Sequence, residues 1–438
     1  MSLCAVQEKI AAKTARIGVI GLGYVGLPVA CLFAEAGFDV VGLDVKADRV
    51  DAINAGVSPI EGREPGLAEL LADVVAGGRL RATTEYAALQ ECDVVTINVE
   101  TPVDEQHTPR YVALRSALRD LGPVLKAGAL VIVESTIAPG TMARLVKPLL
   151  EEASGKRANV DFYLGHCPER VMPGKLLTNL RGVSRVCGGE TPETAQTMIA
   201  LYRHIVQADL DPTDCVTAEL VKTAENAYRD VNIAFANEVA LICEAVGGDV
   251  WKVRELVNKS PGRNMLMPGA GVGGHCIPKD PWLLAYQAQQ TGVPIRLIAA
   301  ARAVNDGMPL HIVALLEDAL REAGRPLEGM RLLVLGYAYL EDSDDTRNSP
   351  SEVLVAALRE RGAEVVIHDP YVVGYQGDVY ALAEGCAAVV VMVAHSEYKT
   401  LDLAALKAAL RAPVLVDGRR VFPQAVGWIY RGVGESIW

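Results

Sequence analysis

Short apolar runs alternate with longer stretches of helical periodicity over the first half of the chain. The runs are short and rich in valine and isoleucine, as buried strands of a parallel sheet are. The alternation of strand and helix predicts a doubly wound α/β sheet. We expect its strands at residues 17–20, 39–43, 94–99, 130–134 and 162–165.

The pattern changes after about Pro212, where residues 217–246 contain neither proline nor glycine. A stretch of this kind predicts one long helix that ends at Gly247. Further helices are expected at 281–291 and 295–324, the second interrupted near Gly307 and Pro309. From residue 330 the strand and helix rhythm returns, with strands expected at 332–335, 365–368, 388–393 and 414–417.

These patterns predict an α/β chain in which two Rossmann-like, doubly wound parallel-sheet domains are joined by a long central helical domain. The length of 438 residues is compatible with about three domains. We expect the domains at residues 1–210, 211–325 and 326–438.

Charge and composition narrow the range of partners. The 42 basic and 54 acidic residues leave a net charge of −12, which argues against a broad surface for nucleic acid or anionic membranes. No apolar run reaches the roughly 18 residues of a membrane span, and no signal-like block begins the chain. We therefore expect a cytoplasmic protein. The nine cysteines show no zinc-binding spacing, so no structural metal is expected.

A dinucleotide fingerprint, Gly21-Leu-Gly-Tyr-Val-Gly26, follows the first expected strand and opens a helix. The first glycine makes the turn, Gly23 lets the backbone approach a pyrophosphate, and the third packs helix against strand. Asp44 ends the second strand and can accept a ribose hydroxyl, which favours NAD over NADP. The alternatives are a glycine turn without ligand and a solvated aspartate. Further residues expected to contact NAD are Tyr24, Val25, Arg49, Thr101 and Thr136.

Cys276 lies on a glycine-rich loop, Gly271-Val-Gly-Gly-His-Cys-Ile-Pro-Lys-Asp280, just before an expected helix. With Asp280 as its cap, the helix dipole and the ammonium of Lys279 would both favour a thiolate. The three glycines of this loop would leave room for a bulky substrate. His275 is adjacent, but neighbouring side chains in an extended loop point apart, so we expect no Cys–His pair. The sequence therefore predicts a nucleophilic Cys276.

Three further positions carry candidate chemistry. Lys222 and Asn226 are four residues apart on the long helix and could together hold a developing alkoxide, although a solvated helical face has the same spacing. Glu169 follows a strand end, where it could act as a base or form a structural salt bridge with Arg170. Thr136 also follows a strand, and an ordinary loop threonine is its alternative.

Together these motifs resemble the UDP-glucose/GDP-mannose dehydrogenase family. The motifs occur in the family's order over nearly the whole chain. Their residues are most similar to those of members that act on UDP-N-acetyl-D-mannosamine. It rests on Gly21–Gly26, Cys167-Pro-Glu-Arg-Val171, Ala218–Glu238, Gly271–Asp280 and Asp345-Thr-Arg-Asn-Ser-Pro350.

The resemblance implies four-electron oxidation of a UDP-sugar at C6, with two NAD reduced in succession and a thioester on Cys276. It implies that Lys222 and Asn226 stabilise the oxyanion and that Glu169 acts in thioester hydrolysis. Asp280 and Thr136 would position water or assist proton transfer. Expected substrate contacts are Glu169, Arg170, Lys222, Asn226, Arg263 and Gly273, with Arg347 near the NAD pyrophosphate. In relatives the long helix is the dimer core, so a homo-oligomer, a dimer or dimer of dimers, is expected.

Two positions depart from the family pattern. Leu340 replaces a lysine that relatives commonly have on the substrate side, and Glu100 replaces a proline. UDP-N-acetylglucosamine and UDP-glucose remain alternative substrates. Two other classes also stay open: a β-hydroxyacid dehydrogenase, which needs no catalytic cysteine, and a non-catalytic regulator that binds NAD or a nucleotide sugar.

Overall fold

The computed structural model describes residues 2–60, 62, 64–423 and 425–435. It forms two compact units, which we describe separately. The first unit comprises residues 1–225 and 282–293, and the second comprises residues 226–281 and 294–438. Among the described residues, no helix is both long enough and apolar enough to cross a membrane.

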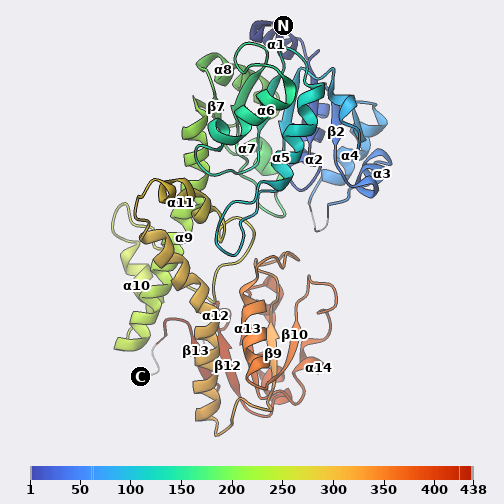
Figure 1. Cartoon of the computed structure of the whole chain (residues 1–438). Coiled ribbons are helices and arrows are strands. Elements are labelled where there is room, and N and C mark those ends of the chain that lie inside the picture. The colour runs from blue at the N-terminus through green and yellow to red at the C-terminus, as the bar shows by residue number, and fades with distance from the viewer. Residues whose placement is uncertain (1, 61, 63, 424, 436–438) are drawn as a thin grey trace. The chain divides into compact units, whose positions relative to one another are not determined.

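The first unit is built on an eight-stranded sheet with the order β3-β2-β1-β4-β5-β6-β7-β8 (Figure 1). All neighbouring strands are parallel except β6 and β7, which are antiparallel. The strands are β1 (Arg16–Ile20), β2 (Asp39–Leu43), β3 (Leu80–Thr83), β4 (Val94–Ile97), β5 (Leu130–Val133), β6 (Tyr163–His166), β7 (Arg185–Gly189) and β8 (Leu210–Asp214).

The predicted doubly wound sheet is confirmed, but sequence analysis missed three of its strands. Strands β3 and β8 carry few apolar residues because they lie at the two edges of the sheet. Strand β7 begins with an arginine and ends with two glycines, although every one of its residues is buried. Its sequence therefore lacks the apolar run that reveals an interior strand.

Helices surround this sheet. Helix α2 is apolar on all sides, as a helix packed between a sheet and other helices should be, and nine of its ten residues are buried. The helices of this unit are α1 (Leu3–Ala11), α2 (Gly26–Glu35), α3 (Ala47–Asn54), α4 (Leu67–Ala76), α5 (Val112–Leu121), α6 (Lys147–Ser154), α7 (Leu176–Gly182) and α8 (Pro192–Tyr202), with short turns η1 (Tyr86–Leu89), η2 (Gly122–Val124) and η3 (Met142–Val146).

The central region is helical, as predicted. Its helices are α9 (Cys215–Val246), α10 (Val250–Val257), α11 (Asp280–Gln290) and α12 (Leu297–Glu322). The expected interruption of the last helix is wrong, because α12 continues through Pro309. A proline inside a helix costs roughly 3 kcal/mol. Helix α12 tolerates it because the helix has buried residues on both sides of the proline and packs against α13, β12 and β13.

The second unit contains a five-stranded parallel sheet with the order β10-β9-β11-β12-β13 (Figure 1). This order is that of a flavodoxin-like doubly wound sheet. Its elements are β9 (Arg331–Leu335), α13 (Pro350–Glu360), β10 (Glu364–His368), α14 (Val379–Ala383), β11 (Ala388–Val391), η4 (Ser396–Thr400), α15 (Leu403–Ala409), β12 (Val414–Asp417) and β13 (Ile429–Gly432). Only β13, an edge strand, was missed from the sequence.

Candidate active site

The glycine fingerprint has the shape that a pyrophosphate requires. Gly21 has φ 86°, and a Cβ on Gly26 would lie 1.9 Å from the Gly21 carbonyl oxygen, so the fold itself requires both glycines. At Gly23 no heavy atom lies within 4 Å of the Cβ position. The chain therefore leaves open space at the one glycine whose expected role is to admit a phosphate.

Asp44, directly after β2, is 5% exposed and faces this loop. Its carboxylate accepts the N–H of Leu22 at 2.9 Å, the N–H of Lys46 at 3.0 Å and the Arg49 guanidinium at 3.0 Å. A carboxylate has about four acceptor positions, so one remains for a ribose hydroxyl. The ion pair with Asp44 also offsets the positive charge of Arg49, which otherwise could attract the 2′-phosphate of NADP.

The equivalent aspartate of the second unit, Asp369, differs. It also follows a second strand, and it accepts the N–H groups of Tyr337 at 2.7 Å and Ala338 at 2.9 Å after β9. It further accepts Tyr371, Val372 and His395. These five protein donors occupy the carboxylate, which leaves no position for a ribose.

Two further NAD candidates meet where the loops after β4 and β5 adjoin. The Thr101 hydroxyl donates a 2.6 Å hydrogen bond to the Thr136 carbonyl. The loop that carries Thr136 is anchored by Glu219 of α9, which accepts the N–H groups of Gly140 at 2.6 Å and Met142 at 2.7 Å. Burial raises the pKa of Glu219 to about 7, although these hydrogen bonds act against the shift. Sequence analysis missed Glu219, whose only signal was its position three residues before Lys222.

Tyr24 of the fingerprint is also held in place. Its hydroxyl donates to the Glu64 carboxylate, which also accepts the N–H of Gly174 at 2.6 Å and of Leu176 at 3.1 Å. Glu64 thus ties the glycine loop to the segment before α7. It lies in a loop without periodicity, so sequence analysis did not single it out.

Glu169 forms a buried ion pair, but not with its predicted partner. The side chain of Arg170 pairs with Glu225 at 2.9 Å and bonds Ser184, so only the Arg170 N–H reaches Glu169, at 2.7 Å. The Glu169 carboxylate pairs instead with Arg185, the first residue of β7. The expected salt bridge to Arg170 is therefore wrong, because the chain turns the Arg170 side chain toward α9.

Lys222 is not part of a solvated helical face. It is 8% exposed, and no carboxylate of the described residues lies within 4.0 Å of its ammonium group. A buried cation without a carboxylate partner is costly unless something else uses its charge. Asn226 lies four residues further along α9 and is half-buried.

The Cys276 loop is tied to α9. Asp280 is the first residue of α11 rather than its cap, is fully buried, and accepts a 2.5 Å hydrogen bond from the Asn226 amide. Its carboxylate also pairs with Lys279 at 3.4 Å. The Cys276 carbonyl accepts the N–H groups of Lys279 and Asp280, which places an exposed Cys276 one turn before the helix.

The glycines of this loop allow close packing within the chain. A Cβ on Gly273 would lie 2.6 Å from the Tyr339 Cβ and 2.7 Å from the Asn348 carbonyl oxygen. The Gly274 N–H donates to the Arg347 carbonyl at 2.9 Å. Gly273 and Gly274 therefore make room for the chain itself, because they let the Cys276 loop pack closely against the segment that carries Tyr339, Arg347 and Asn348.

Cations surround the loop in the second unit. Arg347 pairs with Asp345 through two nitrogens, and this pairing is the main reason that its pKa is raised; a charge on Cys276 adds to the shift. Burial, Lys279 and Arg347 lower the pKa of His275 to about 4, so its imidazole is neutral at pH 7. A neutral imidazole does not supply the positive charge that a Cys–His ion pair needs.

Arg419 is a further residue that sequence analysis missed. Its guanidinium donates to the Gly271 carbonyl at 3.0 Å and to the Met392 carbonyl at 2.9 Å, which joins the start of the Cys276 loop to the end of β11. The run Asp417-Gly-Arg-Arg420 directly after an expected strand was the available signal. Arg263, by contrast, is exposed and donates to the neighbouring Pro261 carbonyl at 3.1 Å.

The candidate residues fall into two groups. The first unit holds the glycine fingerprint with Asp44, Thr101, Thr136, Glu169, Arg170 and Lys222; the second holds Asn226, Arg263, Gly273, Cys276, Asp280 and Arg347. Of the departures from the family pattern, Glu100 is exposed and Leu340 is 36% exposed.

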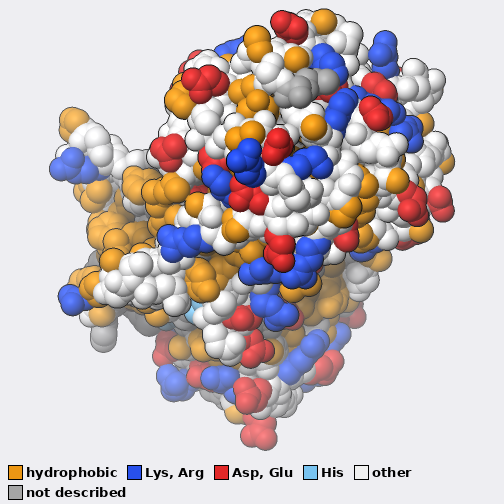
Figure 2. Space-filling model, turned by 45° about the horizontal axis from the view of Figure 1, so that its top comes forward, with side chains coloured by type: hydrophobic (Ala, Val, Ile, Leu, Met, Phe, Trp, Pro, Cys, Tyr) orange, Lys and Arg blue, Asp and Glu red, His pale blue; other side chains and the backbone are white. Residues whose placement is uncertain are grey.

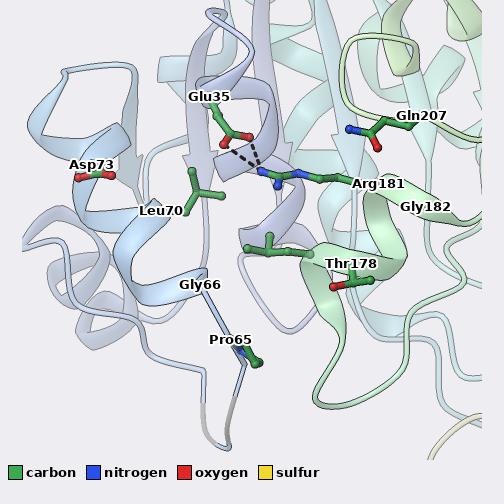
Figure 3. A pocket seen from close by; sticks show the side chains of 10 residues that line it. Glu35, Pro65, Gly66, Leu70, Asp73, Thr178, Arg181, Gly182 and Gln207 are labelled. Carbon is green, nitrogen blue, oxygen red and sulfur yellow. Dashed lines mark hydrogen bonds and ion pairs between the residues drawn. The ribbon is translucent and has the colours of Figure 1, made fainter.

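A separate cavity of about 650 Å³ lies beside Glu35, the last residue of α2 (Figure 3). The Arg181 guanidinium bonds both Glu35 carboxylate oxygens beside it, at 2.9 and 2.6 Å. The cavity is lined by Glu35, Pro65, Gly66, Leu70, Asp73, Leu177, Thr178, Arg181, Gly182 and Gln207. None of the predicted site residues lines it.

Comparison with known proteins decides the family. Residues 15–206 match the NAD binding domain of the UDP-glucose/GDP-mannose dehydrogenase family, residues 216–307 its central domain and residues 333–424 its UDP binding domain. The chain belongs to the UDP-glucose/GDP-mannose dehydrogenase family. Membership confirms the resemblance and the prediction of NAD as cofactor.

Individual members of the family are similar over nearly the whole chain. The UDP-N-acetyl-D-mannosamine dehydrogenase of Pyrococcus horikoshii is 41% identical over 96% of this chain and 99% of its own, and its structure has a TM-score of 0.91. An NDP-N-acetyl-D-galactosaminuronic acid dehydrogenase from Methanosarcina mazei Go1 has a TM-score of 0.86 at 37% identity, covering 99% and 98% of the two chains. A UDP-glucose dehydrogenase from Pyrobaculum islandicum also has a TM-score of 0.86, at 32% identity over 96% and 98%.

Proposed function

We propose that this chain oxidises the C6 alcohol of a UDP-N-acetylhexosamine, with UDP-N-acetyl-D-mannosamine as the favoured substrate, to the uronic acid. The observation that carries the proposal is the tie between the Cys276 loop and α9. The Asn226–Asp280 hydrogen bond supports that loop from the helix that also bears the buried Lys222. The favoured sugar is supported by the 41% identical relative that is named for it.

The residues present fit NAD, which when bound accepts one hydride in each of two successive oxidations. Gly21, Gly23 and Gly26 would hold the pyrophosphate, and Asp44 the adenosine ribose. Between the oxidations, the Cys276 sulfur bonds to the aldehyde carbon as a thiohemiacetal, and the second oxidation leaves a thioester. Water then adds to the carbonyl and the C–S bond breaks, which releases the carboxylate and restores the thiolate.

Each remaining residue has a role that its surroundings support. The ammonium of Lys222 and the amide of Asn226 stabilise the oxyanion, a contribution of roughly 3 kcal/mol for one such donor. One Asn226 N–H is committed to Asp280, which leaves the other for substrate. Asp280 and Thr136 position water or assist proton transfer, and Glu169 activates water for thioester hydrolysis.

We further propose domain boundaries at 1–210, 211–325 and 326–438, a cytoplasmic location, and a homo-oligomer formed through α9. The outer face of α9 supports the oligomer. Tyr228, Phe235 and Ile242 recur every seven residues and are 72%, 55% and 54% exposed. Figure 2 shows hydrophobic side chains gathered at the left of the view, the side on which Figure 1 places α9 and α10. An exposed apolar stripe of this kind fits a partner helix.

The proposal is tested by counting the NADH formed per sugar consumed with UDP-N-acetylmannosamine, UDP-N-acetylglucosamine and UDP-glucose in separate reactions. We expect two NADH per sugar and a preference for the first substrate. Preference for another sugar would reassign the substrate. One NADH per sugar would replace the thioester route with a single oxidation, as in a β-hydroxyacid dehydrogenase. Binding of NAD without turnover would favour a regulator.

A further inference from the structure

The single antiparallel pair in the eight-stranded sheet brings an arginine to Glu169. Strands β6 and β7 pair Gly165 with Gly189 and His166 with Gly188. Continued by three residues, this register sets Glu169 opposite Arg185. Because β7 runs against β6, its first residue lies at the carboxyl end of β6, the edge at which parallel sheets bind ligands. A parallel β7 would place Arg185 at the opposite edge.

Arg185 is held there by buried partners. It is 1% exposed, it pairs with Glu169, and its guanidinium also lies 3.3 Å from the Glu134 carboxylate at the end of β5. Its guanidinium carbon lies 4.9 Å from the centre of the Tyr202 ring. The Tyr202 hydroxyl donates to Glu134 at 2.6 Å, which holds the second carboxylate in turn.

We propose that Arg185 is the positioning residue that orients the Glu169 carboxylate for thioester hydrolysis, and that Glu134 shares the same guanidinium and so tunes the charge on Glu169. This inference rests on the proposed function, because it assigns a task within the hydrolysis step. Arg185 acts through Glu169 and does not touch the reacting atoms. The planar fork of an arginine can bond two carboxylates at once, which the single ammonium of a lysine cannot do in the same geometry.

The charges of the groups around Arg185 agree with the roles proposed for Arg185, Glu169 and Glu134. Four titratable groups face Arg185: Glu134 from β5, Cys167 and Glu169 after β6, and Tyr202 from α8. Burial lowers the pKa of Arg185, but Glu169 and the other groups raise it by more, so the guanidinium stays charged. Burial raises the pKa of Glu134. Burial and the nearby negative charge of Glu134 both raise the pKa of Tyr202. Of the two carboxylates that share the guanidinium, Glu134 is thus the one whose protonated form burial favours.

The test uses the full-length enzyme and two variants, Arg185→Lys and Glu134→Gln. Each is mixed with NAD and UDP-N-acetylmannosamine, or with whichever sugar the stoichiometry assay selects. NADH formation is followed by absorbance, and the adduct on the protein is followed by intact mass. In both variants we expect two NADH per sugar at a near-normal rate in the first turnover, at least a tenfold slower hydrolysis, and accumulation of the acyl adduct.

The pH profile of hydrolysis provides a readout that a purely structural role would not move. In Arg185→Lys the cation is less well placed, so the profile should shift to higher pH. In Glu134→Gln the competing carboxylate is gone and Glu169 has the guanidinium to itself, so the profile should shift to lower pH. Opposite shifts from the two variants are the signature of a shared guanidinium.

A matched control is available at the amino end of the same sheet. Asp93 precedes β4, is 2% exposed, and pairs with Lys9 at 2.7 Å and Lys126 at 2.9 Å. Asp93→Asn should lower thermal stability and leave the hydrolysis rate and its pH profile unchanged.

The outcomes separate the inference from the proposed function. If wild type forms fewer than two NADH per sugar, the proposed function fails and the inference fails with it. If wild type forms two, and the variants hydrolyse the thioester at the wild-type rate or slow both oxidations as much as hydrolysis, only the inference is overturned. Should Arg185→Lys not fold, Glu134→Gln decides alone, because the isosteric amide can still accept from Tyr202.

Discussion

The side-chain amide of Asn226 and the carboxylate of Asp280 are joined by a 2.5 Å hydrogen bond, although 54 residues separate them in the sequence. The bond connects α9 to the first residue of α11, immediately after the loop that carries Cys276. Asp280 is fully buried, so this amide is important for satisfying its carboxylate. The position of the Cys276 loop relative to Asn226 therefore depends on this pair.

Exchanging the two side chains separates the structural role of the pair from its chemical role. Asn226→Asp should place two carboxylates together and lower the melting temperature, because buried like charges repel. The double variant with Asp280→Asn restores an amide–carboxylate bond and should recover most of that loss. Activity should stay at least ~10²-fold below wild type in both, because the amide is no longer on α9. Melting curves measure the stability of each variant, and NADH formation measures its activity. A double variant no more stable than Asn226→Asp would contradict the pairing.

Lys222→Met should strongly lower activity and stabilise the fold. Removing one donor to an oxyanion typically lowers kcat by about 10²–10³-fold. Lys222 is buried, and no described residue places a carboxylate within 4.0 Å of its ammonium group, so methionine should raise stability on the order of 1 kcal/mol. Steady-state kinetics and calorimetry measure the two effects.

Arg302→Met is the matched comparison for Lys222→Met, because Arg302 is a buried cation that does have a partner. It is 2% exposed and pairs with Asp230 at 2.6 Å. Its removal leaves a buried carboxylate unpaired and should cost about 3–5 kcal/mol. If Lys222→Met destabilised the protein to the same extent, the ammonium would be structural and its assignment to the oxyanion would fail.

Glu219 should make stability depend on pH in a defined window. Burial raises its pKa to about 7 from an ordinary 4.5, so the folded protein favours the protonated carboxyl. The stabilisation that this provides is fully present below about pH 4.5 and is lost as the pH rises to about 7. The shift corresponds to about 3 kcal/mol. Urea unfolding of wild type and Glu219→Gln between pH 4 and 8 should therefore show a stability difference that changes in favour of the variant as pH rises; a constant difference would contradict it.

Charge on the outer face of α9 should dissociate the oligomer. Phe235 is 55% exposed in the middle of the apolar stripe, and Phe235→Glu would bury a carboxylate in any interface formed there. We expect sedimentation velocity to show a monomer for this variant and an oligomer for wild type. Val373→Glu, at a 90% exposed valine of the second unit away from α9, should keep the wild-type size. A Phe235→Glu protein that sediments like wild type would move the interface elsewhere.

Much of the fold is readable from local pattern. The run of valines and isoleucines in β1, the glycines after it and the apolar helix α2 are consecutive in sequence, so their periodicity predicts the NAD-binding turn without any distant contact. The same holds for α9, whose 32 residues contain no helix breaker. Pro309 shows the limit of this reasoning, because the packing of α12 outweighs a strong local signal.

The sequence by itself determined the α/β class and the glycine turn with Asp44, because each rests on residue type and short-range spacing, and it was enough to propose Cys276 as a nucleophile. Only the tertiary structure decided which groups pair. Arg185 reaches Glu169 through an antiparallel register, Asn226 reaches Asp280 across 54 residues, and Gly273 packs against Tyr339. Such contacts depend on strand direction and on the approach of distant backbones, which no local periodicity encodes.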